Sequence, residues 1–319
     1  MSDRAGAVSR AVDTILDRSV VGGFSAIGSG VRRRLPTWPA DPAPGALRGR
    51  HVAVTGATSG LGLATARQAG ALGAHVHLVV RNEVKARPVA AEVTAAGAAG
   101  VDTWACDVAD PASVAGFVER FSASGIRLDG LVHNAGALPA ERTESPDGHE
   151  LTMAIHVLGP LRMTDGLLGS LADEARIVLV TSGGMYTQSL PADDPEYLRG
   201  EYSGTTAYAR SKRTQVELLW RLQGRWGERG ITVHAMHPGW AATPGVTSSL
   251  PGFAKVMGPV LRSADDGADT TTWLLATQPP PAGGRLWHDR RARRTHFLPS
   301  TRATPAEVET MWQWVVDNA

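Results

Sequence analysis

Three side chains in the sequence could move a proton together. Tyr208 and Lys212 lie four residues apart in a stretch of helical pattern, so the phenol and the ammonium share one helix face. A free tyrosine has a pKa of about 10, and a nearby cation stabilises its phenolate. Ser182 ends an apolar run and supplies a hydroxyl that can face the same point. The spacing of Tyr208 and Lys212 also occurs by chance in surface helices, so the surrounding motifs decide its meaning.

A glycine-rich segment connects a predicted strand to a predicted helix. It reads Thr55-Gly56-Ala57-Thr58-Ser59-Gly60-Leu61-Gly62. Its glycines permit a tight turn and let backbone N–H groups approach a pyrophosphate, whose charge a helix N-terminus favours. A glycine-rich stretch by itself is more often a plain turn. Here the strand, loop and helix context and the spacing of the glycines favour a dinucleotide cofactor.

The end of the predicted second strand bears on the choice of dinucleotide. Dinucleotide-binding folds normally place an acid there, which hydrogen-bonds the 2′-hydroxyl of the adenosine ribose. This chain has Val79-Val80-Arg81-Asn82 instead. A guanidinium can pair with a 2′-phosphate through charge-assisted hydrogen bonds, so we expect NADP rather than NAD. The alternative is that Arg81 is a solvated loop residue and that Glu83 serves the ribose.

Polar residues follow the next two predicted strands. Asp107 and Val108 follow the third strand, and Asn134-Ala135-Gly136 follows the fourth. Sheets of this class bind ligands at the carboxyl ends of their strands. We expect these residues to contact the adenine and the ribose, although each one alone could be a cap or a turn residue.

Composition bounds the class of protein. The 32 basic and 31 acidic side chains leave a formal charge of +1, which gives no reason to expect nucleic acid as a partner. Cys106 is the only cysteine, which excludes an intramolecular disulfide and a cysteine-based metal cluster and suits a reducing cytoplasm. No metal site is expected. No stretch approaches the roughly 20 apolar residues of a transmembrane span.

Short β-branched runs alternate with longer amphipathic stretches along the chain. Strands are expected at 51–55, 75–80, 101–105, 128–133, 176–181, 231–236 and 285–288. Helices are expected near 61–72, after 82, and near 111–122, 149–171, 208–227, 264–276 and 304–317. This alternation predicts an α/β fold, a single Rossmann-type doubly wound parallel sheet of about seven strands with helices on both faces. We expect this domain over 49–319 and an N-terminal extension over 1–48.

These motifs, taken in order, resemble the short-chain dehydrogenase/reductase superfamily over about residues 50–290. The motifs are the glycine-rich turn, Asn134-Ala135-Gly136, Ser182, the Tyr208/Lys212 pair, and Pro238-Gly239 with Thr243. The resemblance implies that Tyr208 transfers a proton to or from the substrate oxygen and that Ser182 orients this oxygen. It also implies that Lys212 lowers the pKa of Tyr208 and holds the nicotinamide ribose, while Pro238 to Thr243 contact the carboxamide. Hydride would pass between C4 of the nicotinamide and the substrate carbon.

His156 departs from the superfamily pattern. The superfamily usually has Asn at this position, and that Asn helps to anchor a water that relays protons to the lysine. A neutral imidazole also donates and accepts hydrogen bonds, so His156 could hold such a water. The alternative is a histidine that fills space in a packed helix.

Within the superfamily the chain most resembles the dehydrogenase/reductase member twelve group, near the retinol-dehydrogenase-like reductases. The matching segments are Arg18-Ser19-Val20-Val21, Ser182-Gly183-Gly184-Met185, Met236-His237-Pro238-Gly239-Trp240-Ala241, Thr243-Pro244-Gly245-Val246, Gly267-Ala268-Asp269-Thr270 and Asp289-Arg290 with His296. This group says little about the substrate.

Two segments should surround the substrate. The 25 residues between Ser182 and Tyr208 form an insertion that we expect to fold over the site as a lid or wall. The segment after Thr243 is apolar at intervals, which fits either a flexible lid for an apolar carbonyl or alcohol or ordinary core packing; its apolar residues are Pro244, Val246, Leu250, Phe253 and Met257.

The leading hypothesis is an NADP-dependent enzyme that interconverts a carbonyl and an alcohol on a small lipophilic substrate and assembles as a homo-oligomer. One alternative is an NADP-binding regulatory or scaffold protein with little catalysis, which His156 alone supports. A nucleotide-sugar epimerase is a third option, disfavoured because little chain follows Thr243 to form a substrate domain.

Residues 1–35 carry an amphipathic pattern followed by a basic cluster. Val8, Val12, Ile15 and Leu16 follow helical spacing, and Arg32 to Arg34 come before Trp38. Such a segment could make peripheral contact with a membrane, where a lipophilic substrate would be met. The low net charge favours the other interpretation, an arm that packs on its own domain or on a neighbouring subunit.

Overall fold

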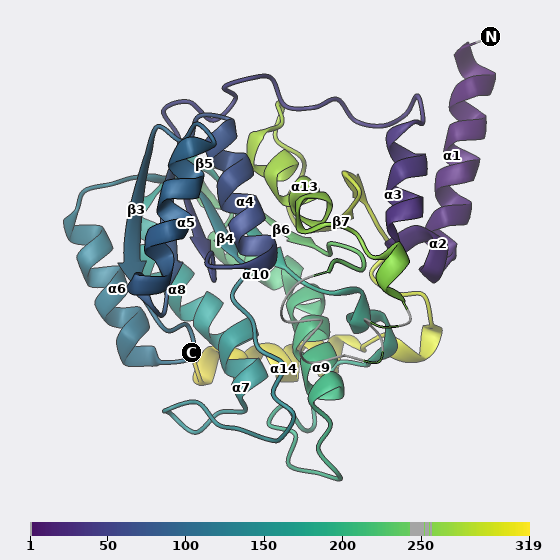
Figure 1. Ribbon diagram of the computed structural model, residues 1–319. Helices are drawn as coiled ribbons and strands as arrows, with labels where there is room; N and C mark the ends of the chain where they lie inside the picture. The colour runs from purple at the N-terminus through teal and green to yellow at the C-terminus, as the bar shows by residue number, and fades with distance from the viewer. Residues whose placement is uncertain (1, 243–251, 253–254, 256) are drawn as a thin grey trace.

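A single mixed sheet organises the computed structural model, which describes residues 2–242, 252, 255 and 257–319 (Figure 1). Within these residues the sheet has eight strands in the order β3-β2-β1-β4-β5-β6-β7-β8. The first seven strands are parallel and β8 is antiparallel to β7. The strands are β1 (His51–Thr55), β2 (His75–Val80), β3 (Gly100–Ala105), β4 (Leu128–His133), β5 (Leu171–Val180), β6 (Thr232–Met236), β7 (Arg285–His288) and β8 (Arg291–Ala292).

The order of the strands reverses direction between β1 and β4. From β1 the chain runs outward through β2 to β3, then returns to place β4 on the other side of β1, where Val52 pairs with Gly130 and Val54 with Val132. The loops that follow β1 and β4 therefore diverge from each other at the carboxyl ends of these strands. Such a switch point is where doubly wound sheets bind their ligands.

Helices cover both faces of the sheet and bury two separate cores. On one face lie α4 (Gly60–Ala71), α5 (Glu83–Ala95) and α13 (Ala264–Ala276), whose inward residues include Ala66, Val89 and Leu274. On the other lie α6 (Pro111–Ala123), α8 (Gly159–Leu167), α9 (Gly204–Glu217), α10 (Leu219–Trp226) and α14 (Pro305–Asp317). Phe117 and Trp226 are fully buried in this second core. The predicted fold class is confirmed.

The predicted elements differ from the observed ones mainly at their ends. The expected helix over 149–171 is divided into a short turn α7 (Leu151–Met153), a π-helical turn over Ala154–Leu158, and α8. The expected helix over 208–227 begins earlier, because the Ser203 hydroxyl accepts from the Thr206 N–H and starts α9 at Gly204. β5 begins five residues earlier than expected, because Leu171 pairs with Leu128 across an irregularity in register.

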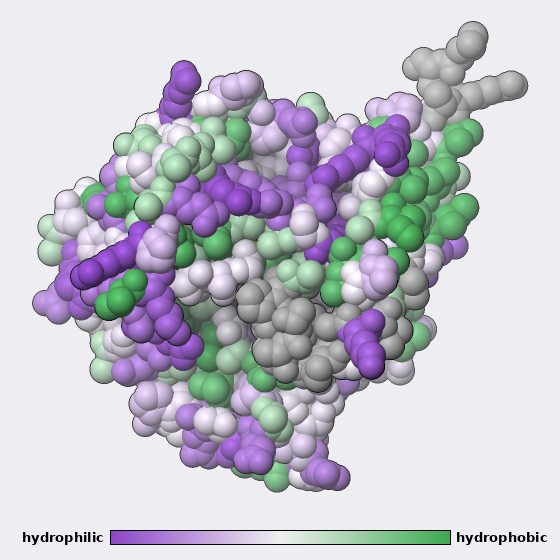
Figure 2. All heavy atoms as spheres, in the orientation of Figure 1, coloured by the Kyte–Doolittle hydropathy of each residue, from purple (hydrophilic) through white to green (hydrophobic). Residues whose placement is uncertain are grey.

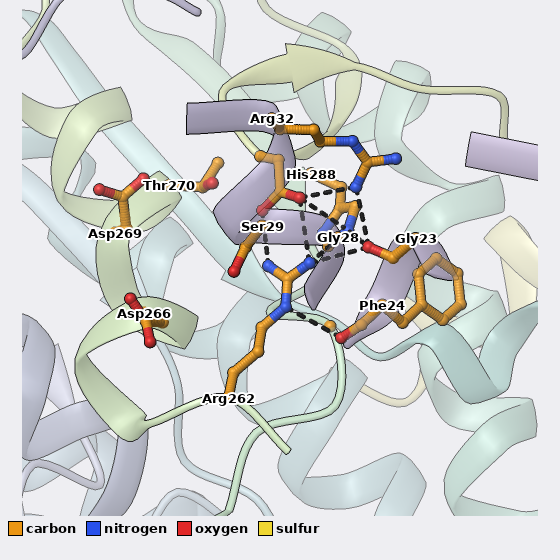
Figure 3. A network of polar contacts seen from close by, with 12 residues as sticks. Gly23, Phe24, Gly28, Ser29, Arg32, Arg262, Asp266, Asp269, Thr270 and His288 are labelled. Carbon is orange, nitrogen blue, oxygen red and sulfur yellow. Dashed lines mark hydrogen bonds and ion pairs between the residues drawn. The ribbon is translucent and has the colours of Figure 1, made fainter. Parts of the chain in front are cut away.

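The N-terminal arm consists of the helices α1 (Ser2–Arg18), α2 (Val20–Phe24) and α3 (Ala26–Arg33). Its link to the domain is a buried cluster of charges (Figure 3). The Arg32 guanidinium donates to Asp289 at 2.6 Å and to Asp13 at 2.8 Å. Arg262, which lies directly before α13, donates to the other oxygen of Asp289 at 2.5 Å and to the carbonyl of Gly23 at 2.8 Å. The arm is thus packed against its own domain through desolvated ion pairs.

The outer surface of the arm has the opposite character. Val8, Ile15 and Ile27 are 63%, 68% and 63% exposed, whereas Asp13 is buried. Figure 2 shows this apolar surface as green atoms over α1 and its neighbours. The arm therefore turns a charged side inward and an apolar side outward. Among the described helices none is both long enough and apolar enough to cross a membrane.

Removing the carboxylate at the centre of this cluster should unfold the protein more easily. We expect Asp289→Asn to lower the free energy of unfolding by about 3–5 kcal/mol, because it removes the buried carboxylate that Arg262 and Arg32 share, although Arg32 keeps its ion pair with Asp13. Urea titration of the wild type and the variant measures this. The matched control is Asp193→Asn, whose side chain is 80% exposed and whose loss should cost no more than about 0.5 kcal/mol.

The same cluster should make stability depend on pH in a defined direction. Burial raises the pKa of Asp289, but His288, Arg262 and Arg32 outweigh this and hold it well below its ordinary value. The stabilisation is therefore present above the unfolded pKa of about 3.9 and is lost as the pH falls below it. The acid-induced loss of stability between about pH 5 and pH 3 should be smaller in Asp289→Asn; an equal loss would show that this carboxyl does not contribute.

Candidate active site

A cleft of about 700 Å³ opens at the carboxyl ends of the strands, on both sides of the switch point. Most of the residues predicted from the sequence line it: Gly56, Ser59, Gly60, Leu61, Arg81, Asn82, Asp107, Val108, Asn134, Ala135, Gly136, Ser182, Tyr208 and Gly239. Thr55, Gly62, His156, Lys212 and Pro238 do not line it. Thr243 and most of the apolar segment that follows it lie outside the described residues.

The glycine-rich turn is held by hydrogen bonds from the neighbouring strand. The Thr55 hydroxyl accepts from the N–H groups of Asn134 and Ala135, both at 2.9 Å. The Asn134 amide donates to the carbonyl oxygens of Thr55 at 3.0 Å and Gly56 at 3.3 Å. Thr55 and Asn134 therefore lock the ends of β1 and β4 together, which explains why Thr55 supports the cleft from below without lining it.

Two positions in this turn require glycine. Gly56 has φ +65°, and a Cβ there would meet the Cα of Ala135 at 2.9 Å. A Cβ on Gly62 would overlap the carbonyl oxygen of Gly56 and the side-chain nitrogen of Asn134. Ser59, the N-cap residue of α4, makes no side-chain capping bond. The first N–H groups of α4 thus lack a side-chain cap, and the arrangement fits the pyrophosphate of a dinucleotide.

The cleft ends in basic side chains beyond β2. Arg81 has a side chain that is 76% exposed, and its guanidinium lies 3.9 Å from the Asp107 carboxylate. Asn82 caps α5 by accepting from the N–H of Lys85 at 3.1 Å. Lys85 itself lines the cleft, although the sequence analysis missed it. Its position one turn into the helix after β2 was the available signal.

Cys106 also lines this part of the cleft, directly before Asp107. Its thiol is buried, and burial raises the pKa of Cys106 to about 12. The thiol is therefore protonated at neutral pH and is not a nucleophile.

At the other end of the cleft Tyr208 and Ser182 lie side by side. Burial raises the pKa of Tyr208, and a side-chain hydrogen bond with Ser182 acts in the opposite direction. Ser182 follows β5 and accepts from the N–H of Gly184 at 3.2 Å, which fixes its side chain at the start of a short helical turn. The result is a phenol that keeps its proton at neutral pH and has a hydroxyl as its neighbour.

Lys212 lies beneath the tyrosine ring. Its ammonium nitrogen is 5.6 Å from the centre of the Tyr208 ring and donates to the carbonyl of Val180 at 2.8 Å. The side chain is buried, which lowers the pKa of Lys212 to about 7. Lys212 and Tyr208 are brought together as predicted.

His156 bridges two parts of the site from within the π-helical turn. Its Nε2 accepts from the N–H of Ala137 at 3.3 Å, so Nδ1 carries the proton and faces the Ser211 hydroxyl at 2.8 Å. Burial, together with the charge of Lys212, keeps the pKa of His156 well below its ordinary value. The ring also meets Tyr208 edge-on, with centroids 5.2 Å apart. Both nitrogens of this neutral ring are therefore occupied by protein groups.

The insertion between Ser182 and Tyr208 contributes its two ends to the cleft. Thr187 and Gln188 line it near the start of the insertion, and Thr205 and Thr206 near the end. The acidic middle lies elsewhere, since Glu196 accepts from His149 at 2.7 Å and from the N–H of Glu150 at 2.7 Å. The insertion is thus a wall whose middle is anchored to the segment before α7. Thr58, Trp240 and Ala241, which belong to segments named in the sequence analysis, also line the cleft, and further lining residues that it missed are Ala137, Leu138 and Ile155.

Comparison with known proteins places this geometry in a family. Residues 50–251 match the family model for short chain dehydrogenase. The human protein Dehydrogenase/reductase SDR family member 12 is 37% identical over 273 residues, which cover 83% of this chain and 84% of that protein. This agrees with the group expected from the motifs.

Two further similarities bear on the site. Human Retinol dehydrogenase 12 is 31% identical over 282 residues, covering 83% of this chain and 85% of that protein. The crystal structure of a blue fluorescent protein from a metagenomic library in complex with NADPH is 27% identical, with a TM-score of 0.62 over 76% of this chain and 96% of that chain.

A methyl group at the closest point of the turn should prevent dinucleotide binding. We expect Gly62→Ala to weaken NADPH binding by about 10- to 100-fold, because overpacking a rigid site costs about 1–3 kcal/mol. Titration of the protein against NADPH fluorescence measures it. Gly224→Ala is the matched control, since a Cβ there meets nothing within 4 Å. Unchanged affinity in Gly62→Ala would show that the dinucleotide does not occupy this turn.

Proposed function

Because the chain belongs to the short-chain dehydrogenase/reductase family, whose members interconvert alcohols and carbonyls with NAD(P), we propose that it is an NADP-dependent oxidoreductase acting on a small lipophilic substrate. The observation that carries the proposal is the pair Tyr208 and Ser182 at one end of a cleft whose other end carries Arg81 and Lys85. We assign the catalytic domain to residues 49–319 and the arm and its connector to residues 1–48.

The residues that line the cleft support the binding of a dinucleotide. The glycine-rich turn and the N-terminus of α4 would hold the pyrophosphate, and Asp107, Val108 and Asn134 to Gly136 would contact the adenine and ribose. Arg81 and Lys85 supply two positive charges for a 2′-phosphate, which supports NADP over NAD. When bound, NADPH supplies the hydride.

Tyr208 would donate the proton to the carbonyl oxygen during reduction, and Ser182 would orient that oxygen. The raised pKa of Tyr208 keeps the phenol protonated at neutral pH, which favours reduction there. Alcohol oxidation needs the phenolate and should speed up as the pH rises. Lys212 would hold the nicotinamide ribose, and its charge would stabilise the phenolate in the fraction of molecules in which it is protonated.

His156 would act as a positioning residue. It connects the loop after β4, through Ala137, to α9, through Ser211, and Ser211 in turn donates to the carbonyl of Tyr208 at 2.8 Å. With both nitrogens engaged in this way, the ring fixes the distance between the loop and the tyrosine helix. This supports positioning over a proton relay through His156.

The substrate end of the cleft supports a lipophilic substrate. Leu138, Ile155, Trp240 and Ala241 line it and offer apolar surface, while the threonines of the insertion offer a few hydroxyls. The relative named retinol dehydrogenase also supports this class. A panel of aliphatic and aromatic ketones, aldehydes and retinoids, followed by the absorbance of NADPH, tests it.

Removing the phenol oxygen should abolish catalysis without affecting cofactor binding. We expect Tyr208→Phe to lower kcat by about 10²- to 10⁴-fold, because general acid catalysis is lost, and to leave the Kd for NADPH unchanged. Retained turnover in this variant would remove Tyr208 from its proposed part in the reaction.

His156→Asn serves as the comparison, since the amide keeps a donor and an acceptor and should retain much more activity than Tyr208→Phe. If the wild type binds NADPH but reduces no compound in the panel, and His156→Asn gains activity, the protein is a cofactor-binding regulator instead.

The two basic residues should determine the choice of cofactor. We expect the Arg81→Ala/Lys85→Ala variant to weaken NADPH binding at least about 100-fold, because it removes two charge-assisted hydrogen bonds of about 1.5–3 kcal/mol each, and to change NADH binding little. Equilibrium titration with both dinucleotides measures this. Arg87→Ala, an exposed arginine of α5 outside the cleft, is the control. Equal losses for NADPH and NADH would show that neither side chain binds the 2′-phosphate.

Peripheral contact with a membrane through the arm stays a prediction. The exposed apolar residues Val8, Ile15 and Ile27 support it, and lipid would bury this surface. We expect the variant with serine at all three positions to sediment less with anionic liposomes while its melting temperature is retained. The control is Val84→Ser/Leu198→Ser, which changes exposed apolar residues elsewhere. Equal sedimentation of both variants would place the contact outside the arm.

A further inference from the structure

Three histidines lie close together at the amino ends of β1 and β2, on the side of the sheet opposite to the cleft. His51 begins β1, His75 begins β2, and His77 follows two residues later. In the register of the sheet His51 pairs with His75 and Ala53 pairs with His77. Since alternate residues of a strand share a face, all three imidazole rings lie on the same face at the amino ends of β1 and β2.

The ring nitrogens of these histidines converge. One nitrogen from each lies within 4.8 Å of the others, and His51 Nδ1 is 3.0 Å from His77 Nε2. Zn²⁺ binds imidazole nitrogen at about 2.0–2.1 Å, which separates two ligands of a tetrahedral ion by about 3.3 Å. Small rotations of the rings are therefore enough to direct all three nitrogens at one point.

The carboxylate of Asp102 contacts two of the three imidazole rings. The Oδ2 atom of Asp102 accepts from His75 Nε2 at 2.8 Å and lies 3.4 Å from His77 Nδ1. Metal-binding histidines almost always donate their second nitrogen to such an acceptor, which fixes the tautomer and the ring orientation. This contact leaves the Nδ1 of His75 free as a ligand.

Binding of an ion requires a change of tautomer at one of the three histidines, His77. Trp104 donates to His77 Nδ1 at 3.1 Å, so His77 Nε2 carries the proton and donates to His51 Nδ1. On binding an ion through Nε2, His77 would carry its proton on Nδ1 instead and donate it to Asp102, while the Trp104 N–H turns away. The ring stays neutral throughout, and no proton is gained or lost.

The surroundings suit a cation. Burial lowers the pKa of His77 to about 4, and burial also lowers that of His51, so both rings are neutral ligands at pH 7. The negative charges of Asp129 and Asp102 act to raise the pKa of His51, so they favour positive charge at this position. The site is also reachable from water, because the side chains of His75 and Asp102 are 31% and 46% exposed.

We propose that His51, His75 and His77 bind one divalent transition-metal ion of the Zn²⁺ class, with Asp102 holding two of the imidazoles and water completing the coordination. The ion would join the amino ends of β1 and β2, the strands whose carboxyl ends carry the glycine-rich turn and Arg81. It takes no part in the proton transfer at Tyr208. The sequence analysis expected no metal site, and this cluster gives no local signal, because His51 and His75 lie 24 positions apart in the chain and the strand register brings them together.

Titration of the full chain, stripped of metal with a chelator, tests the proposal with Zn²⁺ as the probe. We expect one equivalent of Zn²⁺ to bind in calorimetry and to raise the melting temperature. His75→Asn, at a partly exposed position where the fold should tolerate it, should lower the affinity at least about tenfold, and Asp102→Asn by about 10- to 100-fold. His296→Asn, outside the cluster, is the control.

A second variant tests the site without removing any of its ligands, in case His75→Asn does not fold. Trp104→Phe keeps every ligand and removes the hydrogen bond that competes with the metal-binding tautomer, so it should bind Zn²⁺ more tightly than the wild type. Absence of saturable Zn²⁺ binding to the folded wild type would overturn the proposal. So would a His75→Asn variant with wild-type affinity, which would mean that the ion binds elsewhere.

Discussion

The hydroxyl of Thr55 is the contact on which the cleft depends. It accepts two backbone N–H groups from the loop after β4 and donates to the carbonyl of Val132, so β1 and β4 are joined at the point where their loops diverge. This junction places Asn134 against the turn, and Asn134 in turn leaves no space for a side chain at Gly62. The width of the glycine-rich turn, the proposed pyrophosphate site, is thus set by one buried hydroxyl and one amide.

The second constraint on the molecule is a buried charge. Asp289 lies in a turn at φ +50°, a conformation that non-glycine residues adopt rarely, and two arginines from distant parts of the chain hold it there. Arg262 also forms backbone hydrogen bonds with Trp240, which lines the cleft, and with Ala242, and its guanidinium donates to the carbonyl of Phe24. The arm and the end of the cleft proposed for the substrate therefore share one set of contacts.

Most of the fold and much of the site could be predicted from the sequence, because they rest on local signals. Alternating strands and helices, the glycine spacing and the Tyr208/Lys212 spacing are properties of short segments. The contacts that were missed connect segments far apart. Lys85 had a local signal, its position in the helix after β2, but the engagement of both His156 nitrogens depends on the positions of Ala137 and Ser211. The inward orientation of Asp13 could not be predicted because it depends on Arg293, which follows it by 280 residues.

This last separation has a consequence for the order in which the protein folds. The arm precedes Asp289 and Arg293 in the chain, and Arg32 and Asp13 are separated from these partners by 257 and 280 residues, so the ion pairs form only after most of the domain has been made. Until then Asp13 and Arg32 lack these two partners, and closing so long a loop slows any early contact. Formation of these ion pairs is therefore a late event in folding, and a chain without residues 285–319 would hold the arm only loosely, through contacts such as those of Phe24 with Trp240 and Arg262.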